Sequence, residues 1–238
     1  MNEEQLQQLS GEGFNRIPIV REVLADTETP LSTYLKLAKG KHSYFFESVQ
    51  GGEKWGRFSI IGLPCSTVLR VTGRKVMVEV GGEVVEETET NNPFEFISEF
   101  KSRYRVAELD DSQRFAGGLV GYFAYDTVRY VETKIGPSAG DDEINTPDIL
   151  LMLSEEVVVF DNLRGTISFI INVDPSESDV YAKAQNRLDQ LQELLKSPTP
   201  LPESGSGNAA SEDQFHHCLL YTSDAADEGL GVDLGGRR

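Results

Sequence analysis

Two long apolar runs in the second half of the chain constrain its fold most strongly. Residues 149–160 and 166–173 consist mainly of Val, Ile, Leu and Phe, and a polar stretch from Asp161 to Gly165 separates them. β-Branched and aromatic residues on both sides of a short loop that contains glycine are typical of a β-hairpin. We therefore predict one long hairpin over residues 149–173, in a protein built around β-sheet.

Shorter apolar runs earlier in the chain predict further strands. The doublet Gly81-Gly82 stands between two of them and signals a tight hairpin turn. The pattern indicates a meander of short strands rather than alternating β and α units. The predicted strands cover residues 44–46, 58–61, 68–71, 76–80, the residues that follow 84, and the glycine-rich 115–123.

Two segments before the hairpin carry the signals of helices. The first begins at Thr29, a good N-cap residue that is followed by Pro30, and it ends at Gly40. The second covers residues 93–104, where aromatic and aliphatic side chains recur at helical spacing.

A third helix is predicted after Pro175, where Ser176 and Asp179 resemble a capping box. Its apolar stripe is formed by Val180, Ala184, Leu188, Leu191 and Leu195. The strands and helices together place the chain in the α+β class, with mainly antiparallel β-sheets and flanking helices.

Charge and composition exclude several classes of partner. The 238 residues carry a formal net charge of -17, and such an acidic surface repels nucleic acid and anionic lipid. No run of about 18 apolar residues predicts a membrane span. The polar, acidic start of the chain lacks the features of a secretory signal, so we expect a cytoplasmic protein. Two cysteines make no disulfide framework.

A linker divides the chain near residue 197. Residues 197–210 hold three prolines and then a Gly/Ser stretch, which is typical of an exposed linker. Residues 211–217 look like the beginning of a new helix, and hence of a further domain. We therefore predict a folded domain over residues 1–196, a linker over 197–210 and the start of a truncated second domain over 211–217.

We interpret the last 21 residues, 218–238, as a segment that is not natural protein sequence. The strings Cys218 to Glu228 and Val232 to Arg238 resemble the in-frame translation of a sequencing-library adapter. Such a segment is excluded from arguments about the fold. We expect residues 218–238 to be disordered and to pack against nothing.

No pattern of catalytic residues is found in the chain. His42, His216 and His217 have no metal-ligand spacing with other residues, and no Cys-x-x-Cys, Gly-x-Ser-x-Gly or phosphate-binding loop occurs. Cys65 is predicted to be a small buried hydrophobic residue rather than a nucleophile. The sequence thus predicts no catalytic residue and no metal ligand here.

The segment Ser43 to Gly62 is the first candidate for a binding site. Glu47 and Ser48 directly follow an apolar strand. A carboxylate beside a hydroxyl at such a position could hold the ammonium group of a small amino acid. The alternative is that Glu47 faces water and Ser48 caps a turn.

The glycine-rich segment Phe115 to Asp126 is the second unusual feature. Gly117, Gly118 and Gly121 within a strand indicate a close approach of the backbone to its neighbours. A phosphate loop is disfavoured because no helix start with Lys or Ser/Thr follows in the required place. We predict a packing role for these glycines.

These two segments resemble the N-terminal part of anthranilate synthase component I, the large subunit of that enzyme. The likeness covers about Gly13 to Phe215. The matching strings are S-Y-F-F-E-S-V-Q-G-G-E-K-W-G-R-F-S-I-I-G, F-A-G-G-L-V-G-Y-F-A-Y-D, N-R-I-P, P-D-I-L-L-M and V-V-V-F-D-N.

The resemblance implies a reaction, a cofactor, a partner and an inhibitor. The family converts chorismate and glutamine-derived ammonia to anthranilate and pyruvate, in tryptophan biosynthesis. A glutamine amidotransferase subunit supplies the ammonia, magnesium helps to bind chorismate, and tryptophan inhibits. By this likeness Ser48 matches the tryptophan-binding serine and Glu47 its acidic neighbour, whereas the spacing at Arg57 varies too much for an assignment. The catalytic domain would begin near Ser211, so the fragment is expected to be inactive.

Two alternatives stay open. The related component I of aminodeoxychorismate synthase, in the folate pathway, shares the glycine-rich strand. A stand-alone amino-acid-binding module is the other, although the linker and the unfinished helix point to a following domain.

Overall fold

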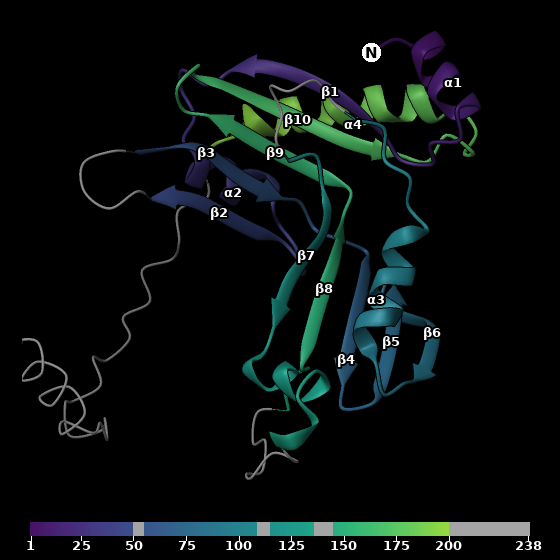
Figure 1. Ribbon diagram of the computed structural model, residues 1–238. Coiled ribbons are helices and arrows are strands. Elements are labelled where there is room, and N and C mark those ends of the chain that lie inside the picture. The colour runs from purple at the N-terminus through teal and green to yellow at the C-terminus, as the bar shows by residue number, and fades with distance from the viewer. Residues whose placement is uncertain (50–54, 109–114, 136–144, 200–238) are drawn as a thin grey trace, which may run out of the picture. The chain divides into compact units, whose positions relative to one another are not determined.

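The computed structural model describes residues 1–49, 55–108, 115–135 and 145–199 (Figure 1). The chain divides into two units, Met1–Pro200 and Leu201–Arg238, and only the first contains described residues. Its helices are α1 (Glu3–Gly11), α2 (Pro30–Leu37), α3 (Pro93–Ser102) and α4 (Val180–Leu195), with 3-10 helices η1 (Tyr125–Tyr130) and η2 (Thr133–Ile135). The predicted linker end, helix start and adapter-like tail over residues 200–238 lie outside the described residues.

The strands form two antiparallel sheets, which confirms the predicted α+β class with mainly antiparallel sheets. The first sheet has the order β1-β10-β9-β3-β2 and the second the order β6-β5-β4-β8-β7. The first sheet is built from β1 (Ile17–Leu24), β2 (Tyr44–Val49), β3 (Trp55–Gly62), β9 (Glu156–Asp161) and β10 (Thr166–Val173). The second is built from β4 (Thr67–Thr72), β5 (Lys75–Val80), β6 (Glu83–Glu89), β7 (Gly118–Phe123) and β8 (Ile149–Ser154).

The prediction of one long hairpin over residues 149–173 is wrong in one respect. Residues 156–173 do form the β9–β10 hairpin, but the apolar run before it breaks at Glu155. The part before Glu155 is β8, which pairs with β4 and β7 in the second sheet. The chain therefore crosses from one sheet to the other at a single residue, as the adjoining β8 and β9 in Figure 1 show.

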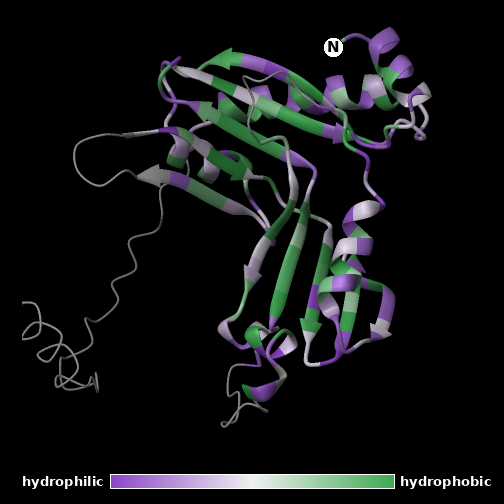
Figure 2. Cartoon of the chain, viewed as in Figure 1, coloured by the Kyte–Doolittle hydropathy of each residue, from purple (hydrophilic) through white to green (hydrophobic). Residues whose placement is uncertain are grey.

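Helices α2 and α4 pack on one face of the first sheet, and α3 packs on the second. In Figure 2 the hydrophobic colour follows the central strands of both sheets, while the exposed faces of the helices are hydrophilic. The predicted stripe of the last helix is confirmed, since all of its members are buried: Val180, Ala184, Leu188, Leu191 and Leu195.

Of the two helix starts that we predicted from capping signals, one is confirmed and the other is wrong. Thr29 caps α2 as expected, and its hydroxyl and that of Ser32 form a reciprocal capping box. The predicted box of Ser176 and Asp179 is wrong. Asp179 is the N-cap of α4 but makes no side-chain cap bond, and the Ser176 hydroxyl instead donates to Asp174 at 2.7 Å.

The predicted packing role of the glycine-rich strand is confirmed for Gly117 and Gly121 but not for Gly118, where an added Cβ would meet nothing. A side chain at Gly121 would overlap the backbone carbonyl of Leu150 on the neighbouring strand, and one at Gly117 would overlap that of Ser154. Gly117 also has a φ of +126°, which L-residues rarely adopt. Gly81 and Gly82 have φ values of +62° and +91° and form the predicted turn between β5 and β6.

Among the described residues, no helix has both the length and the apolar character needed to cross a membrane.

Candidate functional site

The predicted binding residues Glu47 and Ser48 lie in β2, at the edge of the first sheet. Tyr44 to Glu47 pair in regular register with β3, and Glu47 stands opposite Ser59. The register shifts between Glu47 and Val49, so the backbone at Ser48 departs from the ladder. Irregularities of this kind at sheet edges re-aim side chains and are frequent beside binding sites. The side chain of Ser48 lies outside the described part of the structure.

The side chain of Glu47 is exposed, which agrees with the simpler interpretation that it faces water. An exposed carboxylate on an edge strand is also accessible to a ligand's ammonium group, because β3 is the only described strand that flanks β2. The structure thus places Glu47 and the backbone of Ser48 together, as their adjacency requires.

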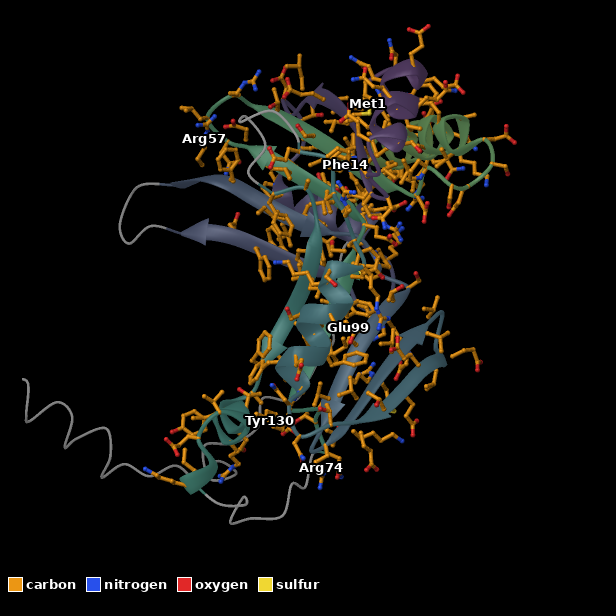
Figure 3. The ribbon with its side chains drawn as sticks, turned by 45° about the vertical axis from the view of Figure 1, so that its right-hand side comes forward. Met1, Phe14, Arg57, Arg74, Glu99 and Tyr130 are labelled. Atoms are coloured by element: carbon orange, nitrogen blue, oxygen red, sulfur yellow. The ribbon has the colours of Figure 1, made fainter. Side chains whose placement is uncertain are left out.

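Arg57, which the resemblance left unassigned, has a structural role near the end of the first sheet (Figure 3). Its guanidinium contacts both carboxylate oxygens of Asp161, with a shortest distance of 2.8 Å, and lies over the ring of Phe58. The Asp161 carboxylate also accepts the backbone N–H groups of Leu163 and Arg164. Hydrogen bonding by Arg57, with help from these N–H groups, lowers the pKa of Asp161 below its ordinary value.

Cys65 does not have the properties of a nucleophile. Its side chain is half-buried, and its thiol lies 3.4 Å from the backbone oxygen of Leu63. Burial raises its pKa to about 11, so the reactive thiolate is scarce at neutral pH. Among the described residues, no group of three His, Cys, Asp or Glu side chains could hold a metal ion.

A pocket of about 420 Å³ lies away from Glu47, between α3 and the glycine-rich strand. Its walls are mainly apolar and include Ile97, Tyr104, Leu119, Phe123 and Leu153. Polar side chains also line it, among them Asn172, whose buried Oδ1 has no hydrogen-bond partner among the described residues. We give this pocket no role in the candidate site, because neither Glu47 nor Ser48 lines it. Volume alone does not identify the site here.

Sequence reasoning missed a polar contact behind β2. The hydroxyl of Tyr44 and that of Ser154 lie 2.8 Å apart, both on buried residues, although 110 positions separate them. Ser154 carries no sequence signal, because a serine at the end of an apolar run is usually exposed. The glycine at position 62, opposite Tyr44, was the one available hint.

Comparison with known proteins finds relatives named anthranilate synthase component 1. Anthranilate synthase component 1 of Pseudomonas aeruginosa is 52% identical over 198 residues, which cover 83% of this chain and 40% of the relative. The Pseudomonas putida protein of that name is 48% identical, covering 97% of this chain and 47% of the relative. That of Neisseria meningitidis serogroup B is 43% identical, covering 90% and 44%. No protein-family model matches.

The chain therefore spans less than half the length of these curated relatives. Among solved structures, anthranilate synthase component I from Streptococcus pneumoniae TIGR4 aligns with a TM-score of 0.49 and 25% identity, over 75% of this chain and 37% of that one.

Proposed function

Because the chain is a homologue of anthranilate synthase component 1 over less than half of that protein's length, we propose that it is the N-terminal regulatory domain of the large subunit of an anthranilate synthase. The observation that carries this proposal is the identity of 43–52% with three relatives of that name, over 83–97% of this chain. The two antiparallel sheets with flanking helices are compatible with it, since they provide a folded unit that precedes a linker.

In this proposal the complete protein converts chorismate and ammonia to anthranilate and pyruvate. A glutamine amidotransferase subunit delivers the ammonia, and magnesium takes part in binding chorismate. The described residues offer no set of metal ligands, so we assign none to this domain. The catalytic residues and the magnesium ligands then belong to the part of the relatives that this chain does not span. The 238-residue chain alone should give no anthranilate above a blank, even with magnesium present.

The regulatory ligand in this proposal is tryptophan, held by Glu47 and Ser48. The exposed carboxylate of Glu47 would face the ammonium group of the amino acid, and the hydroxyl of Ser48 would donate to or accept from its polar end. Two features of the structure support this choice. The residues lie on an edge strand, where a ligand has access, and the register of β2 shifts beside Ser48.

The test uses a complete enzyme, in which this domain is joined to the remaining part of the Pseudomonas putida protein. We expect Ser48→Phe to raise the half-inhibiting tryptophan concentration while chorismate turnover stays nearly intact. Losing a hydrogen bond to a charged ligand group costs roughly 1.5–3 kcal/mol, or about ten-fold or more in affinity, and the bulky ring adds to this. Glu47→Gln should act in the same direction.

The matched control is Ser102→Phe, which places the same ring on an exposed residue at the end of α3. This variant should inhibit like the unmodified enzyme. If Ser48→Phe and Ser102→Phe give the same half-inhibiting tryptophan concentration at one chorismate concentration, Ser48 is not in the site and the assignment is wrong.

A further inference from the structure

Tyr44, the first residue of β2, reaches from the first sheet to the second. Its side chain is 7% exposed, and its hydroxyl oxygen lies 2.8 Å from the hydroxyl oxygen of Ser154. Ser154 is itself buried and is the last residue of β8, next to the point at which the chain changes sheets. Tyr44 also belongs to a hydrophobic cluster with Val68 and Met152 of the second sheet. One buried side chain therefore connects the edge strand to the neighbouring sheet.

Gly62 fixes the place of the Tyr44 ring. The two residues are register partners in the β2–β3 pair, and a Cβ atom at Gly62 would overlap the ring atoms of Tyr44. The ring therefore lies across a residue without a side chain. The ring also contacts that of Phe46, with 5.0 Å between centroids. The ring occupies the space that a side chain at position 62 would fill, and this packing helps to position the start of β2.

Strand β2 has one aromatic contact to α2, where Phe45 stacks on Tyr34 with 5.7 Å between ring centroids, and Tyr44 makes its contact to the second sheet. β2 is an edge strand whose backbone, among the described strands, pairs only with β3, and that pairing becomes irregular directly after Glu47. Tyr44 stands three residues before Glu47 in the regular part of the ladder. A small displacement of Tyr44 would therefore be carried along the extended strand to Glu47 and Ser48.

We propose that Tyr44 is a positioning residue for the amino-acid site, and that its ring over Gly62 and its bond to Ser154 make tryptophan inhibition depend on the second sheet. This inference rests on the function proposed for Glu47 and Ser48. It adds a buried residue that does not touch the ligand but sets the geometry of the strand that does. Burial raises the pKa of Tyr44 to about 12, so its hydroxyl keeps its proton and its hydrogen bond at neutral pH.

The experiment compares Tyr44→Phe, Ser154→Ala and the double variant in the complete enzyme described above. We expect each single variant to raise the half-inhibiting tryptophan concentration about 3- to 10-fold, with kcat and KM for chorismate changed less than about two-fold. The double variant should be no worse than either single one, because both remove the same bond. Should Tyr44→Phe fold poorly, Ser154→Ala, the smaller change, decides alone.

The control is Tyr130→Phe, which removes another bonded tyrosine hydroxyl without a contact to β2. That hydroxyl donates to the backbone oxygen of Gly73 and contacts Asp148, each at 2.7 Å. A general loss of stability would lower the Tm of all three single variants without a selective change in inhibition. If Ser48→Phe relieves inhibition while Tyr44→Phe and Ser154→Ala leave it unchanged, the positioning role is refuted and the proposed site survives. If Ser48→Phe also has no effect, both proposals are refuted.

Discussion

The buried ion pair between Lys36 and Glu28 makes a strong prediction about what holds this domain together. The ammonium of Lys36 contacts the Glu28 carboxylate at 2.5 Å and donates to the backbone oxygen of Leu195 at 2.8 Å. The side chains of Lys36 and Glu28 are only 6% and 12% exposed. The pair therefore ties α2 to the last carbonyl groups of α4, where the chain leaves the domain.

Lys36→Met should be strongly destabilising. It leaves the Glu28 carboxylate buried without its cation and the carbonyl of Leu195 without its donor, and breaking a buried pair in this way costs about 3–5 kcal/mol. At about 2–4 °C for each kcal/mol in a domain of this size, the Tm should fall by roughly 6–20 °C. Thermal and urea unfolding of the 238-residue chain, followed by circular dichroism, measure both quantities.

Two further variants show whether burial is the cause. Lys75→Met removes a cation from a surface pair with Glu87, whose side chains are 46% and 52% exposed, and should cost less than about 1 kcal/mol. Glu28→Leu added to Lys36→Met should recover part of the lost stability, since the carboxylate is then no longer buried alone. Equal small effects of Lys36→Met and Lys75→Met, or a double variant less stable than Lys36→Met, would refute the argument.

Two other predictions test packing and pH dependence. Gly121→Ala should lower the free energy of unfolding by about 1–3 kcal/mol, because its methyl group meets the backbone of Leu150. Gly11→Ala, which has open space around it, should change that free energy by less than about 1 kcal/mol, and urea unfolding compares the two variants. Asp161→Asn should lower the Tm at pH 7 because Arg57 and two backbone N–H groups stabilise the ionised carboxylate. The folded-state pKa of Asp161 lies below the ordinary 3.8, so this stabilisation is present above pH 3.8 and is lost as the pH falls through the lower value. If the Tm difference between the unmodified protein and Asp161→Asn does not shrink in that range, the assignment is contradicted.

Local signals in the sequence predicted the elements whose cause is local. Thr29 followed by Pro30 predicted the start of α2, and the stripe that includes Leu188 and Leu191 predicted the buried face of α4. Gly121 predicted a close backbone approach, because a glycine within a strand often marks a place where another backbone leaves no room for a side chain. In each case the residue type and its spacing determine the conformation without help from distant parts of the chain.

Elements without a local signal were missed. Helix α1 buries only Leu6, so no apolar stripe indicates it, and its capping box of Asn2 and Gln5 was not recognised. Strand β1 contains Pro18, which argues against a central strand. The structure resolves the conflict by placing β1 at the edge of its sheet, where a missing backbone donor is tolerated.

The change of sheet at Glu155 could not have been predicted from the apolar run that contains it. Both β8 and β9 are apolar and largely buried, so the run looks the same whether the strand continues or moves to a second sheet. What decides between the two outcomes is the set of partners, β4 and β7 for one part and β3 and β10 for the other. Those partners are distant in sequence, so the residues of the run itself do not predict the strands with which they pair.

The same limit applies to the candidate site. Residue types can indicate the chemistry of a ligand, but only the fold determines where the residues lie. A carboxylate next to a hydroxyl, as at Glu47 and Ser48, is suitable for the ammonium group of an amino acid, but the same residues also suit a strand end that faces water. The position of that pair depends on Tyr44, which is held by Gly62 from the neighbouring strand and by Ser154 from the other sheet. Ser154 is the last residue of β8, directly before the crossing at Glu155, so the error about this crossing also hid the contact that we propose positions the site.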